Sequence, residues 1–132
     1  MKNPLLNPVV FAAALLSACQ MGAPSEALEL KSDRDPVQIM VSIGKTAQAC
    51  WFKSKDPAFS AYRLAPELKS FTGTPRILVV KKNAPEALPL LVVQAQGSPA
   101  RLDAFGPLMQ DAALNARIGK DVNRWARGGK DC

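Results

Sequence analysis

Two segments of the chain repeat their apolar residues at three- and four-residue steps, the spacing that places them on one face of a helix. The first covers residues 35–53, where Asp35 can cap the helix, Pro36 suits its first position and Gln38 completes a capping box. The second starts at residue 108 or 111 and ends at residue 127. The two apolar stripes are Ile39, Met40, Ile43, Ala47, Cys50 and Trp51, and Leu114, Ile118, Val122 and Trp125.

Four short segments between these helices have the composition of β-strands: residues 58–64, 76–82, 89–96 and 100–105. Gly97, Ser98 and Pro99 form a turn signal, so we expect the last two strands to pair as a hairpin. The connections are too short for further helices, which predicts an antiparallel meander of three to four strands. The sequence therefore predicts an α+β fold. It is a two-layer sandwich of N-terminal helix, meander and C-terminal helix, with both helices on one face of the sheet and Trp51 and Trp125 between the layers.

The beginning of the chain has the pattern of an export signal. Lys2 precedes an apolar run at residues 9–16, which is too short to span a bilayer and suits a signal peptide. The run ends in L-S-A-C at residues 16–19. This ending resembles the lipobox of bacterial lipoproteins, and the resemblance implies cleavage after residue 18 and acylation of Cys19. The alternative is an ordinary buried cysteine in an apolar helix.

The lipobox resemblance also divides the chain. It implies a signal peptide at residues 1–18, and we expect a flexible tether at residues 19–34 and a single globular domain at residues 35–132. Acyl chains on Cys19 would anchor the protein to a membrane without spanning it. Gln20, where inner-membrane lipoproteins carry aspartate, implies a location in the outer membrane, with the periplasmic face favoured over the cell surface.

The three cysteines predict one disulfide bond. If Cys19 carries lipid, Cys50 and Cys132 remain as an even pair in an oxidising compartment. A bond between them would stabilise the fold by about 4 kcal/mol in the chain-entropy description. The alternatives are two free thiols or a covalent dimer through Cys132.

The charge of the chain is basic. Its formal net charge is +6, and removal of residues 1–18, which hold Lys2 and no acidic residue, leaves +5. A basic surface suits anionic lipid head groups, lipopolysaccharide phosphates or an acidic envelope protein, while export argues against nucleic acid. The candidate surface is a stripe on the second helix, formed by Arg117, Lys120, Arg124 and Arg127. The alternative is a solvated helix face that only aids solubility.

The residue pattern argues against an enzyme. The chain has no histidine, which is the commonest general base and a common zinc ligand, and we expect neither a metal nor a cofactor. Ser42 and Lys45 match the S-x-x-K motif of penicillin-binding enzymes, but the other motifs of that family are missing. Gly44 and Thr46 flank Lys45 as in a phosphate-binding loop, but Ile39 stands where that loop needs glycine.

Residues 104–109 and 116–125 resemble small uncharacterised envelope lipoproteins of rhizobial-type bacteria, a resemblance that implies no activity. We therefore predict a non-enzymatic, lipid-anchored envelope lipoprotein that binds another envelope component and supports outer-membrane assembly or integrity. The alternative function is a periplasmic carrier or sensor of a small ligand, apolar or anionic, held between the sheet and the helices.

Overall fold

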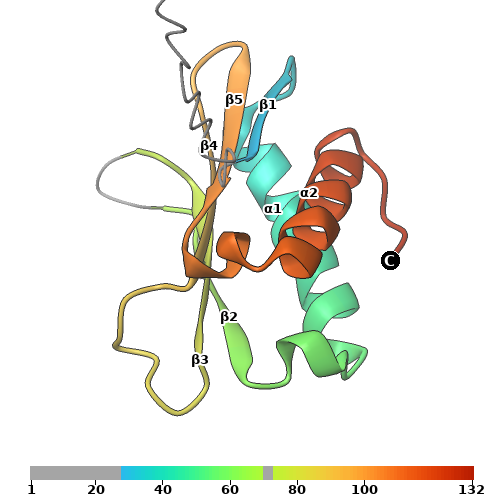
Figure 1. Cartoon of the computed structure of the whole chain (residues 1–132). Coiled ribbons are helices and arrows are strands. Elements are labelled where there is room, and N and C mark those ends of the chain that lie inside the picture. Colours follow the sequence, from blue (N-terminus) through green and yellow to red (C-terminus); the bar gives the residue numbers. More distant parts are fainter. Residues whose placement is uncertain (1–27, 70–72) are drawn as a thin grey trace, which may run out of the picture.

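The computed structural model describes residues 28–69 and 73–132 and folds them into a five-stranded antiparallel sheet with two helices on one face (Figure 1). The strands are β1 (Leu28–Ser32), β2 (Tyr62–Glu67), β3 (Arg76–Lys81), β4 (Leu91–Gln96) and β5 (Ala100–Phe105). The helices are α1 (Pro36–Ala47), the π-helix η1 (Gln48–Lys53), the 3-10 turns η2 (Pro57–Phe59) and η3 (Pro107–Gln110), and α2 (Ala112–Ala126). The predicted α+β class is confirmed.

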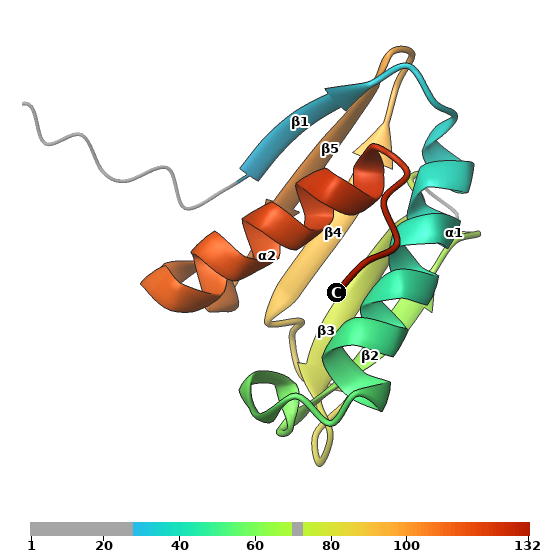
Figure 2. The same cartoon turned by 90° about the vertical axis from the view of Figure 1, so that its right-hand side faces the viewer.

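The order of strands across the sheet is β1-β5-β4-β3-β2. Strands β2 to β5 form the predicted meander, and β4 and β5 form the predicted hairpin. Helix α1 carries the chain from β1 at one edge of the sheet to β2 at the other, while α2 covers the half of the sheet near β1 (Figure 2). No helix within residues 28–69 and 73–132 has the length and apolarity needed to cross a membrane.

The predicted tether over residues 19–34 is wrong for residues 28–32, which form β1. This strand alternates apolar and polar residues, and its Leu28 and Leu30 lie opposite Ala104 and Leu102 of β5 and pack against the core. The sheet therefore has five strands rather than three to four, and the globular domain begins before residue 35. Residues 19–27 of the predicted tether, which include Cys19, and the predicted signal peptide lie outside the described residues.

Strand β2 also lies later in the chain than the sequence predicts, at residues 62–67 instead of 58–64. The segment before it folds as η2, because Asp56 caps that turn and Pro57 suits its first position. Pro66 is tolerated in β2 because an edge strand can direct a position without an N–H away from the sheet.

Both long helices begin at the residues that local sequence favours. Asp35 accepts a hydrogen bond from the backbone N–H of Gln38 at 3.1 Å, and Asp111 accepts one from Leu114 at 2.9 Å. The predicted apolar stripe of the first helix is buried along α1 and η1. Gly44 lets α1 approach β3 closely, because a Cβ there would lie 3.3 Å from the side chain of Ile77.

The two tryptophans lie in the core between the layers, as predicted. Trp51 and Trp125 are both fully buried, with ring centroids 5.1 Å apart. The predicted Cys50–Cys132 disulfide is present and joins residues 82 positions apart in sequence. It fixes the segment after α2 beside η1. The backbone carbonyl of Asp131 in that segment accepts hydrogen bonds from Trp125 and Arg124.

The face of the sheet opposite the helices carries one apolar row across four strands. The register places Ala65, Leu78, Val92 and Phe105 side by side on β2, β3, β4 and β5. Phe105 is 39% exposed, whereas Leu78 is buried. One neighbouring row of this face is polar and charged, formed by Glu67, Arg76, Gln94 and Asp103. On the other side of the apolar row, Arg63 lies opposite the buried Val80. We call the whole surface the outer face.

Candidate functional site

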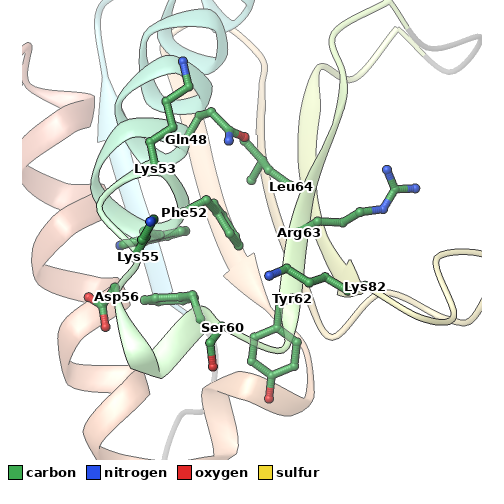
Figure 3. A pocket seen from close by; sticks show the side chains of 12 residues that line it. Gln48, Phe52, Lys53, Lys55, Asp56, Ser60, Tyr62, Arg63, Leu64 and Lys82 are labelled. Carbon is green, nitrogen blue, oxygen red and sulfur yellow. The ribbon is translucent and has the colours of Figure 1, made fainter.

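A cleft of about 420 Å³ opens between the end of the first helical segment and β2 (Figure 3). Residues from η1, η2, β2 and the start of the β3–β4 loop line it. Its volume lies in the range of small-molecule sites, about 300–1,000 Å³. We call this hollow the cleft.

Aromatic side chains form the inner wall of the cleft. Phe59 stacks on Trp51 with ring centroids 4.8 Å apart, and Phe52 meets Phe59 edge-on at 5.8 Å. Trp51 and Phe59 are buried, whereas Phe52 is only partly buried and its ring faces the cleft (Figure 3). An apolar group entering the cleft would therefore contact aromatic carbon on the helix side.

The local sequence explains why these rings converge. The chain widens from α-helix to π-helix at η1, which carries Trp51 and Phe52. It then leaves the helix through Lys55, whose backbone is left-handed with φ 58°. The cap of Asp56 starts η2 at once, and this turn brings Phe59 back against Trp51.

The rim of the cleft is basic. Lys53 and Lys55 stand on its helix side, and Lys82 comes from the opposite side, after β3. The backbone N–H of Lys82 donates to Ala61 at 3.1 Å, which holds this lysine beside β2, and its amine points into the cleft toward Phe52 (Figure 3). Arg63 also lines the cleft, but its guanidinium points away from it (Figure 3).

Among the described residues that line the cleft, Asp56 is the only acidic one, and its carboxylate already has partners. The backbone N–H of Ala58 donates to this carboxylate and is the main cause that lowers the pKa of Asp56 below the ordinary 3.8. Burial opposes this shift, and the hydrogen bond and charge of Arg117 lower the pKa further. Asp56 and Arg117 form an ion pair directed toward α2. Asp56 therefore does not neutralise the lysines of the rim.

A second hollow of about 400 Å³ continues the cleft along α1. The two hollows share the lining residues Gln48, Lys53 and Leu64. The other walls of the second hollow are mostly apolar, formed by Val41, Gly44, Lys45, Pro66 and Leu68. Together the hollows form a groove between α1 and β2 that is aromatic and cationic at one end and aliphatic at the other.

Comparison with family models, curated proteins and solved structures gave no match to this chain. The groove is therefore interpreted from its own geometry.

The structure splits the basic stripe predicted on the second helix. Arg117 pairs with Asp56 and lies 3.5 Å from the Asp121 carboxylate, and Arg124 donates to Asp121 at 2.7 Å. Lys120 and Arg127 are exposed and form no ion pair with a described residue. Contact of the stripe with an anionic partner or a membrane stays a prediction, and it now depends mainly on these two residues.

The cleft itself was missed in the sequence. The segment between residues 51 and 63 is rich in aromatic and basic residues, and this density is the signal that could have indicated a binding site. The prediction from sequence described this segment only as a helix end followed by a strand. Ser42 and Lys45 of the S-x-x-K match both lie in α1, where the Ser42 carbonyl accepts a hydrogen bond from the Thr46 hydroxyl at 3.0 Å and Lys45 lines the groove.

Proposed function

We propose that this chain is a lipid-anchored, non-enzymatic binding protein of the bacterial cell envelope, which holds a small ligand in the groove between α1 and β2. The observation that carries the proposal is the cleft, where a wall of aromatic rings meets lysines that have no described acidic partner. A site with apolar walls and a few polar groups is the usual form of a small-molecule site. This role corresponds to the carrier or sensor expected as the alternative from the sequence.

The polar groups of the cleft support binding rather than catalysis. The Asp56 carboxylate is committed to Ala58 and Arg117, and the Ser60 hydroxyl donates to the carbonyl of Pro57 at 2.9 Å. Neither is arranged as a nucleophile beside a base, which is the pattern of covalent catalysis. Support of outer-membrane assembly would need a protein partner. One exposed apolar residue that could take part in such a contact is Phe105, at the end of the row on the outer face.

The groove should bind an apolar probe with one-to-one stoichiometry. We expect 1-octanol, titrated by calorimetry, to bind with a dissociation constant of about 1 mM or lower. Gln48→Trp places a large side chain at the junction of the two hollows and should abolish this binding. Gln94→Trp, at a half-buried position on the outer face, is the matched control and should bind like the wild type. Equal binding to both variants, or none to the wild type, would reject the groove as a ligand site.

The anchor has a separate test. Cys19→Ser should move the protein from the membrane fraction to the soluble fraction, because it removes the sulfur that accepts the lipid. Gln20→Asp keeps that sulfur and should leave the protein in membranes, shifted from the outer to the inner membrane on density gradients. Unchanged membrane association of Cys19→Ser would contradict the lipid anchor and leave the groove untouched.

A further inference from the structure

We infer that the ligand of the groove is a single-chain anionic amphiphile, with an acidic head group at the lysines of the cleft and an alkyl chain along the second hollow. The inference rests on the proposed function and adds the chemical class of the ligand. It is drawn from the uneven distribution of charge and apolar surface along one continuous groove.

The head-group end has a surplus of positive charge. Lys53, Lys55 and Lys82 form no ion pair with any acidic residue in the described part of the chain, where the acids that do pair bind arginines. Cations can also be stabilised over aromatic rings. The described cations so placed are Arg117, over Phe59, and Arg124, over Trp125, and none of the three lysines is among them. The ammonium groups of the cleft are thus available to an external anion.

The geometry of the lysines suits one small anion. Lys82 reaches in from the β2 side and Lys55 stands on the helix side of the same opening, while the Lys53 amine points along the helix past Gln48, away from Lys82 (Figure 3). Because Lys55 and Lys82 come from opposite walls, a head group between them would be approached by positive charge from both sides. Partial exclusion of water by the aromatic wall strengthens such charge-assisted contacts.

Lys55 occupies a backbone position that ordinarily favours glycine. It follows Ser54, the residue that caps the C-terminal end of η1, and its φ of 58° lies in the left-handed region. A lysine there bears a backbone penalty that glycine would not. Local strain of this kind clusters at binding sites, and at Lys55 it coincides with the rim of the cleft.

The tail end of the groove is shaped for an extended chain. Beyond the shared residues Gln48 and Leu64, the second hollow runs between α1 and β2 over Val41, Pro66 and Leu68. An alkyl chain leaving the cleft would replace water on these aliphatic side chains, and the burial of its methylene groups stabilises the complex. The exposed Lys45 also lines this hollow.

The test compares four probes on the same chain by calorimetry: octyl phosphate, octanoate, 1-octanol and inorganic phosphate. We expect octyl phosphate to bind at least about tenfold more tightly than 1-octanol, and inorganic phosphate to bind more weakly than either. The affinity for octyl phosphate should fall with added salt, while that for 1-octanol should not. Octanoate distinguishes a general acidic head group from a phosphate. If octanoate binds as tightly as octyl phosphate, the cleft accepts any acidic head group. If octanoate binds more weakly, the head group is a phosphate.

Two substitutions locate the head group without disturbing the core. Lys82→Met keeps the apolar stem and removes the charge, and Lys55→Gly suits the left-handed backbone. Each should weaken octyl phosphate binding by about tenfold and leave 1-octanol binding unchanged. Lys31→Met removes the same charge from β1, at the opposite edge of the sheet, and should change neither affinity.

The possible failures are distinguishable. If octyl phosphate and 1-octanol bind equally, or if the Lys82 and Lys55 variants keep full affinity for octyl phosphate, the anionic class is wrong while the groove remains a binding site. If no probe binds, both the inference and the proposed function are wrong.

Discussion

Asp121→Ala is expected to lower the free energy of unfolding by about 3 kcal/mol or more. The Asp121 carboxylate is 4% exposed and accepts a hydrogen bond from the Trp51 indole at 2.8 Å. It also accepts one from Arg124 at 2.7 Å, and Arg117 lies 3.5 Å away. Removing it leaves the buried Trp51 N–H without its acceptor and Arg124 without its described anionic partner, while Arg117 keeps its ion pair with Asp56.

Urea denaturation with the disulfide intact measures this effect. Asp121→Asn keeps an oxygen for Trp51 and loses the charge, so we expect a smaller decrease than for alanine. Asp131→Asn removes the same charge at an exposed side chain and should stay within about 0.5 kcal/mol of the wild type. A decrease below 1 kcal/mol for Asp121→Ala would show that Asp121 does not organise the contact between η1 and α2.

Loss of the Cys50–Cys132 bond is expected to lower the free energy of unfolding by about 4 kcal/mol. The bond joins residues 82 positions apart, so it removes much of the conformational freedom of the unfolded chain. Cys132→Ser is the variant of choice, since Cys132 is exposed and Cys50 is 3% exposed in the core. Substitution at Cys132 therefore opens the bond without creating a cavity.

The disulfide prediction is checked by urea denaturation of Cys132→Ser and of the wild type with and without dithiothreitol. The reduced wild type and the variant should be equally destabilised. Lys130→Ser, an exposed substitution in the same segment, should change stability little. Thiol labelling of the unreduced wild type at Cys132 would contradict the bond itself.

These two contacts also bear on the groove. Trp51 stacks on Phe59, donates a hydrogen bond to Asp121 and follows the disulfide-bonded Cys50 in the chain. The aromatic wall of the cleft is therefore supported from behind by α2 and by the segment after it. We expect ligand binding to weaken in the Asp121 variants through this support, since Asp121 does not line the cleft.

The sequence alone predicted the elements whose signals are local. The helix cap at Asp35, the apolar stripes and the hairpin around Gly97 each act within a few residues, and they appear where expected. The second helix begins just after Asp111, the later of its two expected starts. The pairing of Cys50 with Cys132 followed from counting cysteines, with two alternatives open. β1 was missed although the sequence of these five residues alternates apolar and polar side chains. The extended conformation of this edge strand is stabilised by its pairing with β5, where Leu28 and Leu30 pack, and that pairing is not a local property of the sequence.

The sequence by itself determined the α+β class, both long helices and the cysteine pair, because periodicity, caps and residue counts are properties of the chain. Only the tertiary structure decided which basic side chains form ion pairs and where a ligand could bind. Trp51 meets Asp121 across 70 positions, and Lys82 lines the same cleft as Lys53 and Lys55. Such neighbours are set by the packing of α2 on η1 and by the pairing of β2 with β3, and no local pattern contains them.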